Sequence, residues 1–168
     1  MSLATVSVSE VMTKDVKSAK TSKPVLHAIG LMAKHKISSV IIVDKNKKPV
    51  GIFTEKDAIR VIAERDRPLV LRLKTVMSSP IISINTFTSI KMAMTIMAMK
   101  DVNHLPVVEN EKLVGIVSEK DFFRYIVGHE VLIEELLSEG VAAQSKDLLE
   151  KLCAGMVKSS VWPSPVRA

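Results

Sequence analysis

The sequence has a single cysteine, Cys153, among its 168 residues. One cysteine cannot form an intramolecular disulfide or a zinc site of its own, which is typical of proteins from reducing compartments. The first residues lack the basic and apolar regions of a secretory signal, and no uncharged run reaches the roughly 18 apolar residues that a membrane-spanning helix needs. We therefore expect a cytoplasmic protein that does not enter the membrane.

Aromatic residues and catalytic groups are also scarce. Aromatic residues make up 4% of the chain, too few for the stacking platforms of nucleic-acid-binding proteins, so we do not expect a nucleic acid partner. The histidines show no metal-ligand spacing, and Cys153 has no evident base near it in the sequence. These histidines are His27, His35, His104 and His129. We therefore expect no enzymatic activity and no required cofactor or metal.

Acidic residues are outnumbered by basic ones, 18 to 24, which gives a formal net charge of +6. The excess is local, because residues 34–74 hold eleven basic and five acidic residues, whereas residues 129–152 hold two basic and six acidic. A basic surface favours an anionic partner, such as a nucleotide phosphate, a nucleic acid or an acidic protein patch. Charge alone does not choose among these partners.

What the sequence does contain is an internal duplication. Gly-Ile-Phe-Thr-Glu-Lys-Asp at 51–57 returns 64 residues later as Gly-Ile-Val-Ser-Glu-Lys-Asp at 115–121. Val-Met-Thr at 11–13 likewise has a counterpart, Val-Met-Ser, at 76–78. A long period that occurs only twice indicates two supersecondary units that complete one another's core. Two equivalent polar turns predict two equivalent sites.

Each repeat is predicted to contain a short strand, a helix, two strands that form a hairpin, and a second helix. In the first repeat we expect strands at 15–19, 39–43 and 50–53, a helix that begins near Pro24, and a helix at 55–65. In the second we expect strands at 81–84, 104–108 and 113–117, and helices at 89–100 and 119–127. The sequence thus predicts an α/β (α+β) fold of two β-α-β-β-α repeats, residues 8–66 and 72–127.

Helical periodicity also predicts caps and buried faces in the first repeat. Thr21 or Ser22 is expected to cap the first helix, and Thr54 the second. The residues expected to be buried are Val25, Ile29, Met32 and Ala33 in the first helix, and Ala58, Ile59, Ile62 and Ala63 in the second.

Two features predict an oligomer. The helix at 89–100 carries Met92, Met94, Met97 and Met99, which cannot all face one core. Methionine suits surfaces that repack, so part of this stripe is interpreted as an oligomer contact, with ordinary core packing as the alternative. Residues 128–168 follow the repeats, and their two apolar stretches predict an acidic helical hairpin with a non-helical end. We expect at least a homodimer.

In both copies of the motif, a glycine and apolar residues precede a hydroxyl residue, two charged residues and an aspartate. One interpretation is a capping box, in which Thr54 and Ser118 cap helices while Asp57 and Asp121 occupy their first turns. The other is a nucleoside phosphate pocket. There the helix N-terminus binds phosphate, the carboxylate accepts hydrogen bonds from ribose hydroxyls, an apolar strand faces the base, and the glycine lets the ligand approach closely. Recurrence within a duplicated unit favours the pocket.

The chain from about Val8 to Val127 resembles a pair of CBS domains, also called a Bateman module. The resemblance rests on Val-Met-Thr/Ser in each repeat, the helix end Leu31-Met32, the run at 104–109, and both copies of Gly-x-x-Thr/Ser-x-x-Asp. It implies two β-α-β-β-α units paired through their sheets about a pseudo-two-fold axis. It also implies two clefts that bind adenosine-containing ligands.

By position, the resemblance implies that Asp57 and Asp121 bind ribose hydroxyls and that Thr54 and Ser118 bind the first phosphate. In the second repeat it adds Asn103 and His104 at phosphate-binding positions and Pro106 beside the base. Ile81 is a further candidate contact, and Arg124, one helical turn after Asp121, is placed to reach a phosphate or to pair with that aspartate. The first repeat has Ser38, Ser39 and Ile41 at the positions of Asn103, His104 and Pro106. We therefore expect the cleft of the second repeat to be the stronger site. The alternatives are an exposed strand histidine for His104 and ordinary ion pairs for Arg60 and Arg124.

We therefore expect a non-catalytic regulatory module that senses adenosine-containing ligands in its inter-repeat clefts. The candidate ligands are AMP, ADP, ATP and S-adenosylmethionine. With only about 41 residues after the repeats, the module would act in trans on a client protein through its acidic tail, and the resemblance implies a homodimer. The alternative is a nucleic-acid-binding or purely scaffolding pair with vestigial clefts.

Overall fold

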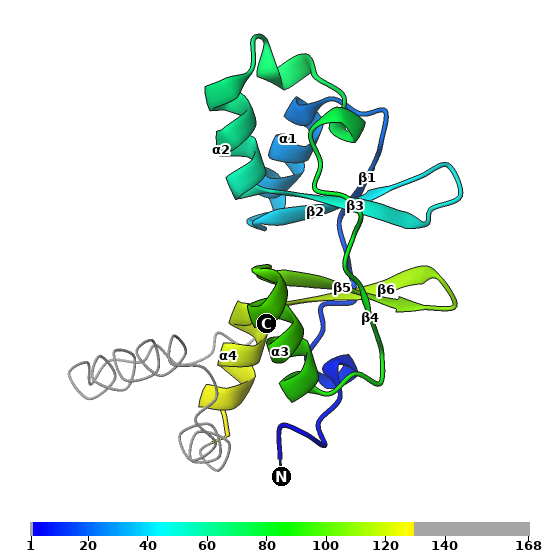
Figure 1. Ribbon diagram of the computed structural model, residues 1–168, viewed down its shortest axis with the longest axis vertical. Coiled ribbons are helices and arrows are strands. Elements are labelled where there is room, and N and C mark those ends of the chain that lie inside the picture. The colour runs from blue at the N-terminus through cyan, green and yellow to red at the C-terminus, as the bar shows by residue number, and fades with distance from the viewer. Residues whose placement is uncertain (1, 130–168) are drawn as a thin grey trace, which may run out of the picture.

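The computed structural model describes residues 2–129, and the helical tail predicted after them lies outside the described residues. Each repeat folds into a three-stranded sheet and two helices (Figure 1). The first contains β1 (Ser18–Lys20), α1 (Val25–His35), β2 (Ser39–Val43), β3 (Pro49–Thr54) and α2 (Glu55–Glu64). The second contains β4 (Ile84–Asn85), α3 (Ile90–Lys100), β5 (His104–Glu109), β6 (Lys112–Ser118) and α4 (Glu119–Val127). The predicted fold class and order of elements are confirmed.

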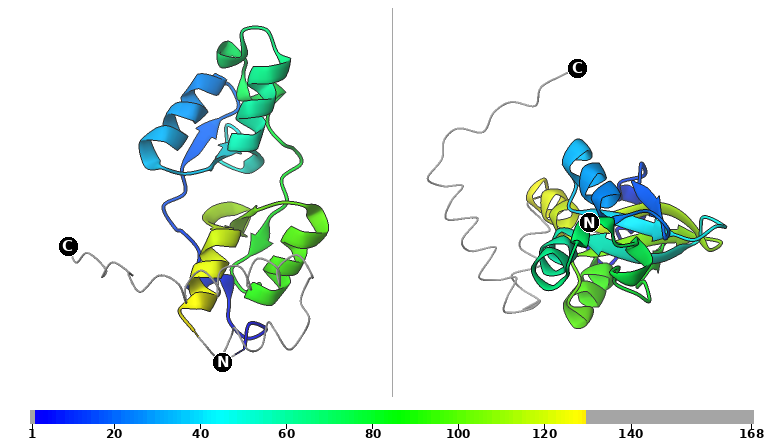
Figure 2. Two further views of the ribbon diagram at one scale, coloured as in Figure 1. Left: turned by 90° about the vertical axis from the view of Figure 1, so that its left-hand side faces the viewer. Right: turned by 90° about the horizontal axis from the view of Figure 1, so that it is seen from above.

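Both sheets have the same topology. β1 runs parallel to β2, which forms an antiparallel hairpin with β3, and β4, β5 and β6 repeat this arrangement. The sheets face each other in the middle of the molecule, and each carries its own two helices on the outer side (Figure 1). A second view shows the same layers (Figure 2). The central strand β2 is buried at every position, because helices cover one face of its sheet and the other repeat covers the second face.

The start of α1 differs from the prediction. The helix begins at Val25 after Pro24, and no side chain caps it, so neither Thr21 nor Ser22 has the expected role. The N–H of Val25 donates instead to the carbonyl oxygen of Leu71, at 2.9 Å, in the segment between the repeats. A distant part of the chain therefore satisfies a donor that sequence reasoning assigned to a local cap.

The buried helical faces are also rotated from the predicted ones. The buried residues are Val25, Ala28 and Met32 in α1, and Asp57, Ala58 and Val61 in α2. Ile29 packs against the core from a partly buried position, while Ala33, Ile59, Ile62 and Ala63 are exposed. The face of α2 includes a buried carboxylate, which a search for apolar periodicity alone does not count.

The methionine stripe of α3 divides between two environments. Met97 is buried and Met94 packs against the core, whereas Met92 and Met99 are 55% and 77% exposed. The four side chains therefore do face different surfaces, as their spacing predicts.

The segment before the first strand of each repeat packs on the other repeat. Thr13 forms an isolated bridge with Ile116 of β6, and Ser78 forms the equivalent bridge with Ile52 of β3. Leu3, Val6 and Val8, the last of these in a 3-10 helix (Val8–Glu10), belong to the core of the second repeat. Leu73 and Val76 belong to the core of the first. Each repeat thus packs with the leading segment of the other repeat and not with its own. The packed units therefore differ from the units that repeat in the sequence.

This exchange explains why the repeats share both the glycine of the Gly-x-x-Thr/Ser-x-x-Asp motif and the Val-Met-Thr/Ser segment. A Cβ added to Gly51 would lie 2.5 Å from the sulfur of Met77 and 3.0 Å from the carbonyl oxygen of Ser78. A Cβ on Gly115 would collide in the same way with Met12. Each glycine therefore makes room for the Val-Met-Thr/Ser segment of the opposite repeat. The close approach expected of a ligand at these glycines is made by a methionine instead.

Candidate functional site

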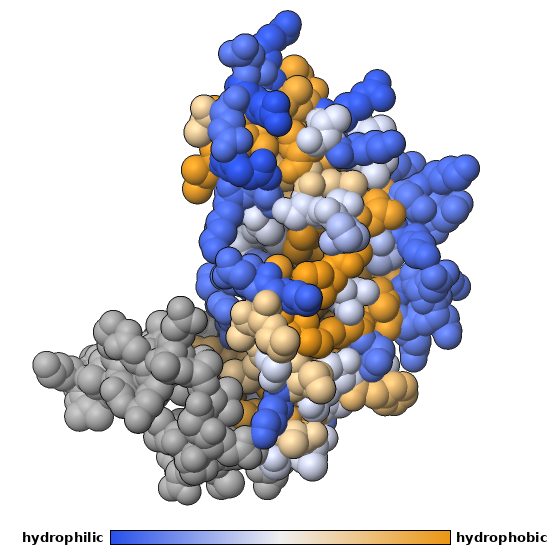
Figure 3. Space-filling model, viewed as in Figure 1, coloured by the Kyte–Doolittle hydropathy of each residue, from blue (hydrophilic) through white to orange (hydrophobic). Residues whose placement is uncertain are grey.

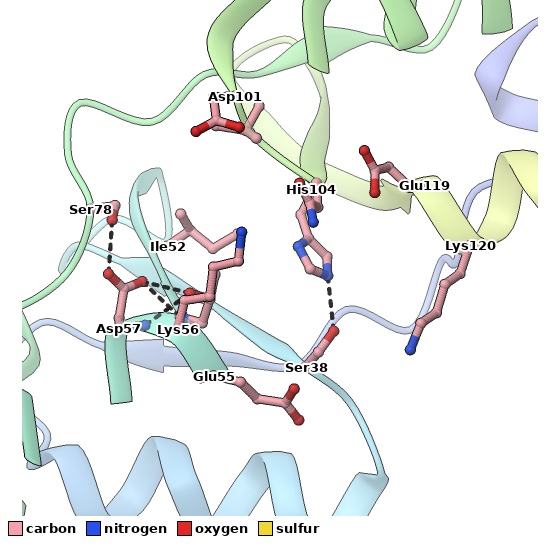
Figure 4. A pocket seen from close by; sticks show the side chains of 13 residues that line it. Ser38, Ile52, Glu55, Lys56, Asp57, Ser78, Asp101, His104, Glu119 and Lys120 are labelled. Atoms are coloured by element: carbon pink, nitrogen blue, oxygen red, sulfur yellow. Dashed lines mark hydrogen bonds between the residues drawn. The ribbon is translucent and has the colours of Figure 1, made fainter. Parts of the chain in front are cut away.

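Two clefts open between the stacked sheets, one beside each copy of the motif. Cleft one encloses about 390 Å³ and lies at the junction of β3 and α2 (Figure 4). The loop between α3 and β5 of the second repeat forms its opposite wall. Cleft two encloses about 550 Å³ and lies at the junction of β6 and α4, opposite the loop between α1 and β2. Both volumes fall within the range of about 300–1,000 Å³ typical of small-molecule sites.

In cleft one, Asp57 is held by hydrogen bonds to both carboxylate oxygens. The backbone N–H and the hydroxyl of Thr54 donate to one oxygen, each at 2.9 Å. The guanidinium of Arg60 donates to the other oxygen at 2.8 Å, and the hydroxyl of Ser78 donates to it at 3.2 Å. The hydroxyl of Thr54 also accepts from the N–H of Asp57, so the capping box and the ion pair with Arg60 are both present.

In cleft two, Asp121 has fewer partners. The backbone N–H and the hydroxyl of Ser118 donate to one oxygen, at 2.8 and 2.7 Å. The other oxygen lies 3.5 Å from the guanidinium of Arg124, at the limit of a hydrogen bond. The side chain of Arg124 is 79% exposed. One face of the Asp121 carboxylate is therefore better placed than that of Asp57 to accept a hydrogen bond from a ligand.

The structure corrects the assignment of Asn103 and extends that of His104, which lies beside Ser118 and Asp121 as expected and also in the other cleft. Asn103 lines cleft one with Asp57, whereas sequence reasoning placed it beside Ser118 and Asp121. His104 lines both clefts. Because the sheets stack face to face, the loop before β5 lies opposite the start of α2 rather than the start of α4.

Two further expected contacts lie away from the clefts. Pro106 is buried within β5 and pairs in register with Ile116. Ile81 is partly buried in the segment that leads into β4. Neither residue is part of the lining of cleft one or cleft two. Pro106 lies inside the sheet, and Ile81 lies in the chain before β4.

His104 and Ser38 meet where the two clefts adjoin. The hydroxyl of Ser38 lies 3.0 Å from Nε2 of His104, and both residues line both clefts (Figure 4). Burial lowers the pKa of His104 below its ordinary value of 6.5, and the attraction of the nearby Asp121 carboxylate only partly offsets this effect. His104 is therefore neutral near pH 7 and does not act as the cation that its position in the resemblance implies.

The lowered pKa of His104 predicts a pH dependence of stability. In the unfolded chain the imidazole binds a proton below about pH 6.5, but in the folded protein it does so only at lower pH, so acidification favours unfolding. We expect the free energy of unfolding to decrease as the pH falls through this window. His104→Gln, which keeps a polar side chain but does not titrate, should show a smaller decrease in urea unfolding at about pH 7.5 and 5.5. Equal decreases in the two proteins would contradict this interpretation.

Sequence reasoning missed Ser78 and Lys36. Ser78 donates to Asp57, and its position in the recurring Val-Met-Thr/Ser marked it as equivalent to Thr13, but the sequence does not show which aspartate it meets. Lys36 lines cleft two and is the residue in the left-handed conformation at the end of α1. No local signal indicated that this helix end faces a cleft.

The described residues give two further observations. Residues 2–129 contain no group of three histidine, cysteine, aspartate or glutamate side chains placed to hold a metal ion. Over the same residues, no helix has the length and apolar character needed to cross a membrane.

Comparison with known proteins identifies the repeats. The family model described as the CBS domain matches residues 8–64 and 73–128. An uncharacterized protein of Methanopyrus kandleri is 32% identical over 124 residues, which cover 73% of this chain and 63% of that protein. The chain spans less than two thirds of the length of this relative and of an uncharacterized protein of Methanocaldococcus jannaschii, 63% and 40% respectively.

Solved structures agree with the fold. The structure of a CBS-domain containing protein from Agrobacterium tumefaciens superimposes with a TM-score of 0.67 at 26% identity, covering 71% of this chain and 92% of that one. The CBS domain pair of protein MJ0100, solved in complex with 5-methylthioadenosine and S-adenosyl-L-methionine, gives a TM-score of 0.67 at 24% identity. It covers 71% of this chain and 98% of its own, and at this identity it supports the fold alone.

Proposed function

This chain belongs to the CBS domain family, and from that premise we propose that it is a regulatory module whose two clefts bind adenosine-containing ligands. Ligand occupancy would change how the module interacts with a client protein. The observation that carries the proposal is the occurrence, in both clefts, of a carboxylate beside a hydroxyl at a helix N-terminus. This pair of groups suits a ribose and the phosphate attached to it.

The ligand class is supported by the chemistry of the site, and a protein of the same fold binds compounds of this class. Ribose hydroxyls can donate to Asp121, and the positive end of the α4 helix dipole favours an anion. The CBS domain pair of protein MJ0100 holds two adenosine derivatives in its crystal structure. We propose AMP, ADP, ATP or S-adenosylmethionine as ligands of this chain, bound without turnover.

Cleft two is the better prepared of the two sites for a ribose. A hydroxyl can bond to the outer oxygen of Asp121 while Ser118 keeps its bonds to the inner one. In cleft one, a ligand would have to compete with Ser78 for Asp57. We therefore still expect Asp121→Ala to weaken AMP binding more than Asp57→Ala does, although the reason is not the set of neighbours predicted from sequence.

A thermal-shift and calorimetric titration tests the proposal. A ligand at 100 times its dissociation constant adds about 2.7 kcal/mol to stability, which for a chain of this size raises the melting temperature by roughly 5–10 °C. AMP should raise the melting temperature more than adenosine does. 2′-Deoxy-AMP should bind more weakly than AMP, because it lacks one hydroxyl partner of Asp121. If AMP, ADP, ATP and S-adenosylmethionine all left the melting temperature unchanged, the motif would be a capping box alone.

We also propose that two copies of the chain associate. Leu26 on α1, Ile59 and Ile62 on α2, and Val70 in the 3-10 helix (Pro68–Val70) are each more than half exposed. Figure 3 shows apolar surface over α2, whereas the surface at the two hairpin turns is hydrophilic. An exposed apolar face of this kind is typical of an interface. Light scattering should give about twice the 18.5 kDa mass of the monomer.

A further inference from the structure

The two clefts share several lining residues but differ in the charges of the others. Ser38, Glu55, His104 and Lys120 line both. The charged residues found in cleft one alone are Lys56, Asp57, Asp101 and Glu119. Those found in cleft two alone are Asp15, Lys17, Lys36, Asp121 and Arg124. Carboxylates thus predominate in the first set and basic groups in the second.

Ion pairs do not remove this difference. In cleft one Asp57 is paired with Arg60 at 2.8 Å, which leaves the carboxylates of Asp101 and Glu119 opposite Lys56. Figure 4 shows these two carboxylates on the wall that faces Asp57.

In cleft two the two carboxylates have basic neighbours. Asp15 is paired with Lys17 at 2.6 Å, and Asp121 lies 3.5 Å from Arg124. Setting these pairs aside leaves Lys36 as the charge that belongs to cleft two alone.

Lys36 and Asp101 carry the contrast between the clefts. They are equivalent positions of the two repeats, since each ends the first helix of its repeat in the left-handed conformation, with φ of 53° and 50°. The N–H of each bonds to an equivalent methionine carbonyl, that of Met32 or Met97. The same place in the fold therefore presents an ammonium to cleft two and a carboxylate to cleft one.

This contrast determines which ligands each cleft can accept. A phosphate that enters cleft one approaches the carboxylates of Asp101 and Glu119, which repel it. The same group in cleft two approaches Lys36 and the exposed guanidinium of Arg124. A cationic substituent in place of phosphate is attracted by the carboxylates of cleft one and repelled by the basic groups of cleft two, and an uncharged substituent is not repelled in cleft one.

We propose that the clefts sort adenosine derivatives by charge, with cleft two binding nucleotides and cleft one binding adenosine derivatives that carry no phosphate. This inference rests on the proposed function, and it specifies the ligand class of each site. A module built in this way responds to two ligands of different charge at once. The contact between Ser38 and His104, where the clefts adjoin, lets each ligand affect the site of the other.

Charge exchange at the equivalent positions tests the proposal. The probes are AMP and 5′-amino-5′-deoxyadenosine, which share a base and a ribose but carry opposite charges at the 5′ position. We expect Lys36→Asp to weaken AMP binding at least about tenfold in calorimetry and to leave the amine unaffected. We expect Asp101→Lys to weaken binding of the amine by a similar factor and to leave AMP binding in cleft two intact. Both positions are exposed at helix ends, so the folded state should tolerate either change.

Lys36→Gln and Asp101→Asn serve as neutral controls with intermediate expected effects. Melting temperatures within a few degrees of the wild type would establish that all four variants are folded. If both probes bound the wild type and neither exchange altered their affinities, charge sorting would be wrong while adenosine binding stood. If neither probe nor adenosine bound the wild type, the proposed function itself would be wrong.

Discussion

Replacing Leu3 and Val8 together by alanine is expected to lower the free energy of unfolding by about 4–7 kcal/mol, since truncating a buried leucine costs about 2–5 kcal/mol and a buried valine somewhat less. Both side chains are almost fully buried, Leu3 at 3% and Val8 at 0% exposure, and both pack in the core of the second repeat. A domain is stable by only about 5–15 kcal/mol, so the loss would approach the total. Urea unfolding followed by circular dichroism measures it.

The control truncates a large apolar side chain that is exposed and lies outside the apolar face proposed as the interface. Phe87→Ala removes a larger group from a position that is 85% exposed. Surface substitutions usually change stability by no more than about 0.5 kcal/mol each. A small loss in the Leu3 and Val8 variant would mean that the N-terminal segment is not part of the second core, and that the exchange of segments described above is wrong.

Replacing Asp57 by alanine is expected to lower the free energy of unfolding by about 2–4 kcal/mol. Its side chain is 10% exposed and accepts hydrogen bonds from Thr54, Arg60 and Ser78, so its removal leaves several partly buried donors without an acceptor. Breaking a buried ion pair from one side costs about 3–5 kcal/mol. The guanidinium of Arg60 is 45% exposed, so water replaces part of the lost interaction.

Asp121→Ala is the natural comparison, because the duplication provides the same motif with fewer bonds. Arg124 is 79% exposed and lies 3.5 Å from Asp121, so we expect roughly half the loss. We therefore expect Asp57→Ala to lower stability more than Asp121→Ala does, and Asp121→Ala to weaken AMP binding more than Asp57→Ala does. If one variant had the larger effect in both unfolding and calorimetry, this division of roles would be wrong.

The sequence predicts the helices and hairpin strands well and the helical faces less well. The first strand of each repeat, expected at 15–19 and 81–84, forms instead at Ser18–Lys20 and Ile84–Asn85. α4 occupies the residues expected of it, and β2 does so as well, because a repeated cap and a β-branched run are local signals. The exposed face of α2 was predicted to be buried because Ile59 and Ile62 have helical spacing. The buried face of α2 instead carries Asp57, which accepts a hydrogen bond from Ser78 in another segment of the chain, and local periodicity does not contain that information.

The candidate site could be predicted only within each repeat. Thr54 and Asp57, and likewise Ser118 and Asp121, are joined by bonds across three residues, and their recurrence shows that they are equivalent. The walls opposite them come from the other repeat. Asn103 was therefore assigned to the wrong aspartate, since the order of residues along the chain does not show which loops lie opposite each other when two sheets stack.

The exchange of leading segments also bears on how such a chain arose. A single repeat alone would expose the strand surface that Thr13 or Ser78 covers in the present structure, and two identical copies could cover one another by trading these segments. An ancestor of half this length would then have been an obligate symmetric dimer with two identical clefts. In a single chain that holds both repeats, the two copies of a position can differ. Lys36 and Asp101 occupy one position of the repeat with opposite charges, which two identical copies could not provide.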